Sequence, residues 1–299
     1  MSIKIKWVDR NAVVDGFRLY RSLTPIDDTA LPAPLTTLAA NVFEYIDTTA
    51  LRNTVYYYKI GAYLGAQETL SLNKPMGFMP YTGPGPQTLL KGDIKAGFYG
   101  EMLFDELIGY DDFRSIHGIT AWSPPATKPT KWLKFVCNGK ILFFPDQGAF
   151  AATVSPTQIY QAGLLYGTND DTIYNTTLKS NNGLINQVRP LTIRGDVFIP
   201  RLPIGRADRT LVTTDTASTQ GGELDTCLGM MFLNRGRLAT FPLQWGDYVN
   251  DAAQFFTSDS YTTANLMARG TAIFDQTNVL SVTGTHANFT YRPVLELVL

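Results

Sequence analysis

Cysteine and histidine are scarce in this sequence. Its 299 residues include two cysteines, Cys137 and Cys227, and two histidines, His117 and His286. These side chains are far apart in the sequence, so they lack the local spacing of a zinc site. A reducing cytosol disfavours the alternative of a disulfide between the two cysteines, and we expect both to be free thiols in the core. Neither histidine has a nucleophile nearby in the sequence, and we interpret both as structural or exposed.

Charge is sparse as well, and its two signs are interspersed. Charged residues make up 17% of the chain, and the formal net charge is -1. Such a chain has no field for steering nucleic acid or an anionic membrane, so we expect neither partner. No apolar run approaches the roughly 20 residues needed to span a bilayer, and no hydrophobic segment follows Met1. We therefore expect synthesis in a cytosol without a signal peptide.

The common catalytic signatures are missing. The sequence contains no G-x-S-x-G, and the glycines of GDIKAGFYG do not match G-x-G-x-x-G. Asp105 with Glu106, and Asp111 with Asp112, have the residue types of a glycoside hydrolase, which needs two carboxyl groups at a set separation. Two neighbouring acidic residues often occur by chance on a surface turn, and we interpret these pairs as a solvated acidic loop. We therefore predict that the protein is not an enzyme and that it binds neither a cofactor nor a metal ion.

Aromatic residues, threonine, asparagine and glycine are plentiful, which suits β-structure with long ordered loops. A chain of 299 residues is about twice a typical domain, and this favours a small module followed by a larger one. The Gly-Pro-Gly-Pro sequence within MPYTGPGPQT has neither helical nor strand-pairing potential. We predict a linker at residues 79–89, between domains at residues 1–78 and 90–299.

Residues 15–63 carry the clearest strand pattern. The runs GFRLYRS, VFEYIDTT and TVYYYKIGAY alternate side chains of opposite character, as in a sheet with one buried face. Tyr56 and Tyr58 share one face of the last run, and Lys59 lies on the other. The order of these runs resembles strands C, E and F of a fibronectin type III module. That resemblance implies a β-sandwich with Trp7 as the core tryptophan of strand B and Tyr56 as the corner tyrosine of strand F.

The segment IKIKWVD already has the character of strand B, so the usual first strand of such a module is missing. Strand B then lies at an open sheet edge, which proteins cover, charge or pair with another chain. Lys4 and Lys6 are candidates for charges that protect this edge. The alternative is pairing with a strand of a neighbouring subunit, which makes Lys4 and Lys6 candidate partner-binding residues.

The second domain contains two clear strand predictions. Asn138-Gly139 between two apolar runs is the strongest short hairpin signal in the chain, and it predicts a type I′ turn within residues 132–145. The final FTYRPVLELVL is dense in apolar residues, which indicates a buried terminal strand. The Arg-Gly-Asp triplet at residues 194–196 lies between two predicted strands, and we reject an integrin-binding interpretation of it.

Two helices are predicted in the same domain. Ser155 is a candidate N-cap and Pro156 suits the first helical position, in a helix that ends at Gly167. A second helix is predicted over residues 224–233, with acidic residues near its N-terminus, where the helix dipole favours them. The predicted fold class is therefore mainly β with some α, an α+β protein whose N-terminal β-sandwich precedes a larger α+β domain.

Residues 90–299 resemble a domain of tailed-bacteriophage virion proteins. The shared phrases are GDIKAGFYGEMLFDELIGY, WLKFVCNGKILFFPDQ, LTIRGDVFIPRLPIGR, the ELDTCLGMMF block and the terminal YRPVLELV. The resemblance implies a location in the virion and contacts with other virion proteins. It conveys no catalytic activity.

The terminal R-P-V-L strand, after scattered tryptophan, asparagine and glycine, also resembles the C-type-lectin-like fold. In that fold the two chain ends pair and long loops form the binding surface. Asn234, Arg235, Trp245 and Tyr248 would lie in the exposed part, where aromatic rings beside amides suit contacts with sugars or a protein partner. Core packing is the alternative for Trp245. The calcium ligands and disulfides of calcium-dependent lectins are missing, so the resemblance implies neither calcium nor a particular sugar.

These features together predict a non-enzymatic structural component of a tailed-phage virion, in a tail, baseplate, collar or fibre-attachment position. Virions repeat such parts with symmetry, so we expect a homo-oligomer or a symmetric ring. The alternative is a receptor-binding adhesin whose second domain recognises a glycan or protein on the host surface.

Overall fold

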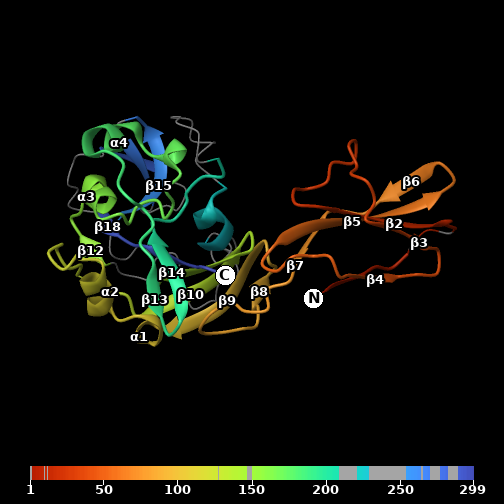
Figure 1. Cartoon of the computed structure of the whole chain (residues 1–299), viewed down its shortest axis with the longest axis horizontal. Coiled ribbons are helices and arrows are strands. Elements are labelled where there is room, and N and C mark those ends of the chain that lie inside the picture. The colour runs from red at the N-terminus through yellow and green to blue at the C-terminus, as the bar shows by residue number, and fades with distance from the viewer. Residues whose placement is uncertain are drawn as a thin grey trace, which may run out of the picture.

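The computed structural model describes residues 2–9, 11, 13–126, 128–146, 150–208, 221–228, 254–263, 265–269, 277–281 and 289–299. The protein is mainly β, with 39% strand and 14% helix, which confirms the predicted α+β class dominated by sheets. In Figure 1 the strands coloured red to orange form one body and most of the other elements form a second, with the join near β7 and β8.

The N-terminal body contains two sheets. The smaller sheet pairs β1 with β4, and the larger has the order β3-β2-β5-β6, with β7 also paired to β5. The strands are β1 (Ile3–Lys6), β2 (Gly16–Ser22), β3 (Thr36–Ala39), β4 (Glu44–Asp47), β5 (Val55–Leu64), β6 (Gln67–Leu70) and β7 (Lys74–Gly77).

A shared apolar cluster holds these two sheets together. Ile3 and Ile5 of β1 meet Tyr56 and Tyr58 of β5 in this cluster, so the alternation along β5 buries the predicted tyrosine face. The hydroxyl of Tyr56 accepts a hydrogen bond of 3.3 Å from the backbone N–H of Leu51, a short way upstream, which is the type of contact that a corner tyrosine makes.

Trp7 does not sit at the centre of this cluster. It follows β1 directly, is only partly buried, and packs against the margin of the cluster. Its ring meets that of Phe17 edge to face, with ring centroids 5.5 Å apart. Trp7 therefore links the core to the surface, and the prediction of a core tryptophan holds only in part.

The opposite face of β5 is covered, contrary to the simple alternation. Lys59 is 4% exposed. Its ammonium group pairs with Asp28 and donates to the carbonyl of Ile26 at 3.3 Å. The long proline- and threonine-rich loop after β2 thus folds over the sheet and buries a lysine that strand periodicity assigns to an outer face.

The second body contains a seven-stranded and a five-stranded sheet. The orders are β13-β14-β19-β11-β10-β9-β8 and β12-β18-β15-β16-β17. The strands are β8 (Lys91–Gly92), β9 (Ala96–Leu103), β10 (Lys131–Cys137), β11 (Lys140–Pro145), β12 (Ala151–Ala152), β13 (Leu191–Ile193), β14 (Asp196–Arg201), β15 (Gln254–Thr262), β16 (Asn265–Arg269), β17 (Thr277–Ser281), β18 (Phe289–Tyr291) and β19 (Val294–Leu297).

The predicted hairpin is confirmed at the centre of the larger sheet. Strands β10 and β11 pair from Trp132 opposite Pro145 to Cys137 opposite Lys140. Asn138 and Gly139 both have positive φ, at 49° and 82°, as a type I′ turn requires.

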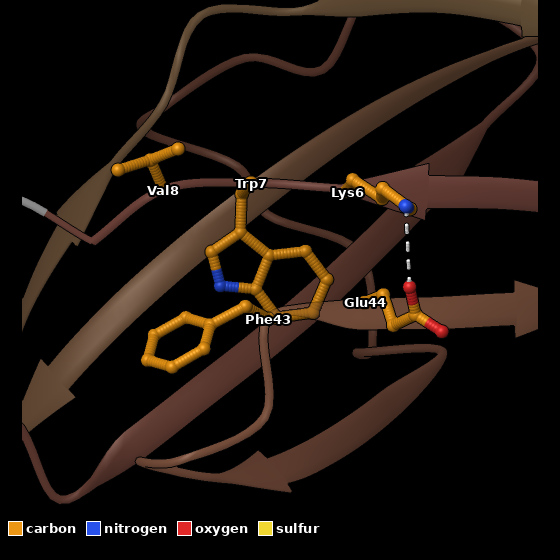
Figure 2. A pocket seen from close by; sticks show the side chains of 5 residues that line it. All are labelled: Lys6, Trp7, Val8, Phe43 and Glu44. Atoms are coloured by element: carbon orange, nitrogen blue, oxygen red, sulfur yellow. Dashed lines mark ion pairs between the residues drawn. The ribbon is translucent and has the colours of Figure 1, made fainter.

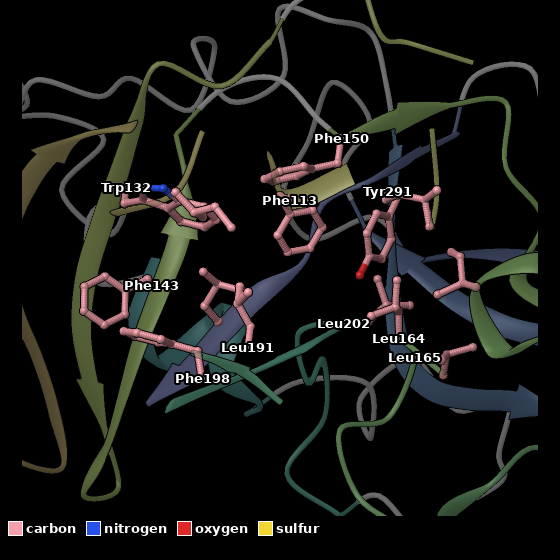
Figure 3. Close-up of a cluster of buried hydrophobic side chains, with 14 of the residues drawn as sticks. Phe113, Trp132, Phe143, Phe150, Leu164, Leu165, Leu191, Phe198, Leu202 and Tyr291 are labelled. Carbon is pink, nitrogen blue, oxygen red and sulfur yellow. The ribbon is translucent and has the colours of Figure 1, made fainter. Parts of the chain in front are cut away.

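This larger sheet is buried on both faces. Trp132 and Phe143 point into a large aromatic cluster, which Figure 3 shows together with the side chains that reach it from other elements. Leu133 and Phe144, at alternate positions of the same strands, belong to a second cluster on the opposite face. Apolar residues occupy consecutive positions of β10 and β11 because neither face of these strands meets solvent.

The chain ends in a central strand of this sheet. Leu295 of β19 packs in the larger cluster and Val294 in the smaller, so the predicted buried terminal strand is confirmed. The end-to-end pairing implied by the lectin-like resemblance is wrong. Strand β19 lies between β14 and β11, whereas β8 and β9, which open the domain, lie beyond β10.

The described helices are short. They are α1 (Phe104–Leu107), α2 (Tyr110–Ile116), α3 (Pro156–Gln161) and α4 (Thr176–Asn182), with a 3-10 turn at Asp171–Ile173 and a π-helical turn at Leu224–Leu228. The cap at Ser155 is confirmed, since its side chain accepts from the N–H of Gln158. The helix ends at Gln161 rather than at Gly167, because Gly163 already has a positive φ of 74°.

The linker is folded onto the second body. Lys134 of β10 is fully buried, and its ammonium group is surrounded by linker oxygens. These acceptors, at 2.8–3.3 Å, are Thr82 Oγ1 and the carbonyl oxygens of Gly83, Pro84 and Pro86. The hydroxyl of Tyr81 also donates to the Asp196 carboxylate, at 2.7 Å. The segment lacks regular structure, as predicted, but its backbone is fixed by these contacts.

Candidate interaction surface

The predicted partner-binding residues fall in two groups. Lys4 and Lys6 lie on β1, and their side chains are 49% and 66% exposed. The other four predicted residues lie outside the described residues and form no part of the surface described below. They are Asn234, Arg235, Trp245 and Tyr248.

The open edge of β1 can be read from its pairing with β4. Lys6 lies opposite Glu44, and the N–H of Trp7 donates to the carbonyl of Phe43 at 3.1 Å. In an antiparallel ladder the backbone groups of alternate residues point to the same neighbour. The backbone groups of Ile3, Ile5 and Trp7 therefore face β4, and those of Lys4, Lys6 and Val8 face away.

Nothing in the part of the chain that the structure describes pairs with this outward edge. The β1–β4 sheet contains two strands, and no isolated bridge reaches β1. The prediction of an open edge at this strand therefore agrees with the strand pairing of the described residues. An unpaired edge offers its N–H and C=O groups to another strand.

The side chains beside this edge carry a small excess of positive charge. Lys4 and Lys6 share one carboxylate, Glu44 Oε2, at 3.0 and 3.6 Å. The hydrogen bond from Lys4 lowers the pKa of Glu44 below its usual value. Because these groups are about half exposed, their pairing contributes little stability. The charges therefore remain available to a partner.

An apolar groove opens at the end of the same strands. Figure 2 shows its lining, in which Trp7 and Phe43 lie beside each other and Lys6 pairs with Glu44. The groove has a volume of about 510 Å³. Phe43 is 45% exposed and Val8, the fifth lining residue, is 82% exposed. Large apolar side chains at such exposure, next to a free edge, are typical of interaction sites.

Trp7 also carries an unused donor. Its Nε1 atom is buried, and it donates no hydrogen bond to any of the described residues. A buried indole N–H normally has an acceptor, since leaving it unsatisfied costs about 1–3 kcal/mol. The groove therefore presents the aromatic surface of Trp7, while the indole N–H itself is buried and unsatisfied.

The acidic pairs lie on α1 and α2. Asp105, Glu106, Asp111 and Asp112 are all exposed, as expected of solvated acids, but the prediction of a loop is wrong, because they lie in the first turns of α1 and α2. Glu106 accepts a hydrogen bond from the N–H of Leu103 at 3.0 Å and so caps α1. Among the described residues, no group of three or more histidine, cysteine, aspartate or glutamate side chains is placed to hold a metal ion.

His117 ends α2 and is a structural residue. Its ring packs on Phe113, with ring centroids 4.6 Å apart. Burial, together with the charge of Arg189, lowers its pKa to about 4. It is therefore neutral at physiological pH, in agreement with the structural interpretation of this histidine.

Comparison with known proteins assigns no relative. No protein-family model, curated protein sequence or solved structure matches this chain. Within the described residues, every helix is too short or too polar to cross a bilayer.

Sequence reasoning found the open strand but missed the groove. Val8 and Phe43 lie within the predicted strand runs IKIKWVD and VFEYIDTT, whereas in the structure β1 ends before Val8 and β4 begins after Phe43. Their exposure depends on how β1 and β4 end, which strand periodicity does not specify. A large aromatic side chain near the start of a predicted strand, Phe43, was the available signal.

Proposed function

We propose that this chain is a non-enzymatic structural component of a tailed-phage particle and that it assembles through the open edge of β1. The observation that carries the proposal is the outward-facing backbone of Lys4, Lys6 and Val8 beside the apolar groove. The assignment to a phage particle is supported by the sequence resemblance of residues 90–299.

The physical basis of assembly is strand addition. An added strand would satisfy the free N–H and C=O groups of β1, and its side chains would reach the Trp7–Phe43 groove. Backbone pairing supplies affinity and the groove supplies specificity. The expected partners are other virion proteins or further copies of the chain in a homo-oligomer or ring, at a tail, baseplate, collar or fibre-attachment position.

A second candidate function is a receptor-binding adhesin. It is supported by a groove of about 590 Å³ on the second body, whose lining includes the charged side chains of Asp105, Lys128 and Arg194. Such groups can hydrogen-bond a host glycan. Two aromatic rings line the groove: Phe104 is buried and stacks on Trp132, and Tyr110 is covered by Lys128, whose Nζ lies 4.2 Å from the ring centre. The groove thus offers no open stacking surface, and we place the adhesin second.

Immunogold labelling of purified particles, with antibody against residues 90–299, tests the proposal. A structural role predicts label at a fixed position and host adsorption unaffected by the antibody. Label on distal fibres together with blocked adsorption would support the adhesin instead. Absence of label from the particles would refute both.

A further inference from the structure

Two cysteines that are far apart in the sequence meet in the second body. Cys137 ends β10, and Cys227 lies in the π-helical turn at Leu224–Leu228. Both are free thiols, 3% and 0% exposed, within the same apolar cluster. That turn lies directly against β10, and the two thiols are within hydrogen-bonding reach of each other.

A small cavity leads to this thiol pair. It has a volume of about 170 Å³ and is lined by Cys137, Asn138, Thr226 and Glu223, among others. This volume holds several water molecules, and hydrogen peroxide is only slightly larger than water. Cys137 lines the cavity, whereas Cys227 lies behind it with no exposed surface.

We propose that Cys137 and Cys227 form a reversible intramolecular disulfide when the protein meets a hydroperoxide. The thiolate of Cys137 attacks one oxygen of hydrogen peroxide, which breaks the O–O bond, gives a sulfenic acid and releases hydroxide. The sulfur of Cys227 then attacks the Cys137 sulfur and displaces the hydroxyl group, which leaves as water once it is protonated. Overall, two thiols and one peroxide yield one disulfide and two waters.

The environment assigns the two cysteines different roles. The hydrogen bond with Cys137 and burial raise the pKa of Cys227 well above its ordinary value. Cys227 is therefore a poor first nucleophile and acts as the resolving thiol once its neighbour is oxidised. Formation of the linkage should accelerate as pH rises, because the resolving step needs the Cys227 thiolate.

The disulfide would tie the Leu224–Leu228 turn to the central sheet. It closes a long loop of chain, which restricts the unfolded state and stabilises the folded one. The inference is independent of the proposed assembly role, since it concerns a different body and a different chemistry.

The test uses the full chain, treated with hydrogen peroxide, then alkylated in denaturant and mapped by mass spectrometry. The expected product is one peptide pair joining Cys137 to Cys227, lighter by two hydrogen atoms, with the free thiol count falling from two to zero. Dithiothreitol should restore both thiols. The thermal midpoint of the oxidised protein should be several degrees above that of the reduced protein.

Two variants provide controls. Cys227→Ala should accumulate a sulfenic acid at Cys137 that a dimedone probe captures, and Cys137→Ala should leave Cys227 unmodified. Sulfinic or sulfonic acid at Cys137 of the natural chain beside a free Cys227 would overturn the proposal. Disulfides exclusively between chains would overturn it too. The mapping of the natural chain decides the question even if a variant fails to fold.

Discussion

At the scale of single residues, His117 links folding to pH. Its pKa is about 4 in the folded protein and 6.5 in an unfolded chain. The unfolded state therefore binds a proton more readily between these values, and stability is lost as pH falls from 6.5 towards 4. Solvent screening reduces the loss from the ideal ~3 kcal/mol to about 2 kcal/mol at this half-buried site.

We expect denaturant unfolding of the second body to show this loss between pH 7 and pH 4.5. The variant His117→Leu should show a smaller pH dependence over the same range, because it has no proton to bind. Equal pH dependence of the two proteins would contradict the assignment. The difference in unfolding free energy between the two proteins at each pH excludes the contribution of the carboxylates, because both proteins contain them.

Lys134 is the residue that fixes the linker. Burial lowers its pKa to about 8, so it is still protonated at pH 7 and can donate to the linker oxygens. In Lys134→Met those acceptors lose their donor, which costs about 1–3 kcal/mol. We expect faster hydrogen exchange of the amides in residues 82–87.

Lys131→Met is the matched control for this change. Lys131 lies on the same strand, but its side chain is 42% exposed and pairs with Glu101 rather than with the linker. Exchange in residues 82–87 should be unchanged in this control. If Lys134→Met also left that exchange unchanged, the lysine would not hold the linker.

At the scale of elements, the β10–β11 turn is one of the contacts between the two bodies. A Cβ added to Gly139 would lie 3.1 Å from Val55 Cγ2 of β5, at a φ of 82° that favours glycine. Gly139→Ala should therefore destabilise the protein by about 1–2 kcal/mol for the backbone strain alone, and more for the contact. Thermal unfolding measures the total.

Gly195, in the β13–β14 turn, separates these two effects. Its φ is 93°, but an added Cβ would meet no atom within 4 Å. Gly195→Ala should cost only the strain. A loss equal to that of Gly139→Ala would show that contact with β5 adds nothing.

The sequence predicts those elements whose shape depends on neighbouring residues, and it does not predict features that depend on contacts between distant parts of the chain. The turn at Asn138-Gly139 and the cap at Ser155 were predicted because their chemistry is local. The helix end at Gln161 was missed, since both Gly163 and Gly167 follow the helix and periodicity does not choose between them. The cover over Lys59 and the meeting of Cys137 with Cys227 depend on tertiary packing, which leaves no local pattern.

At the scale of the whole molecule, a module with an open strand edge is joined to a domain with a large buried core. The sequence alone predicted that the strand with Lys4 and Lys6 is an open edge, because the usual first strand of such a module is missing before it. It did not identify the groove at Phe43. Deleting residues 1–6 should abolish incorporation into particles while residues 90–299 stay folded.

The most direct test is particle incorporation of Lys6→Pro. The N–H of Lys6 faces away from β4, so proline there removes a donor from the open edge and leaves the β1–β4 ladder intact. Ile5→Pro is the folding control, because its N–H faces β4 and its loss should disrupt the small sheet. Lys6→Ala is the side-chain control, since it keeps the backbone donor.

The measurement is the amount of each full-length variant in purified particles, set against thermal unfolding of the isolated protein. Lys6→Pro should fold normally yet be incorporated at least about tenfold less than Lys6→Ala, a loss of roughly one backbone hydrogen bond. Incorporation of folded Lys6→Pro at the natural level would contradict assembly through the β1 edge.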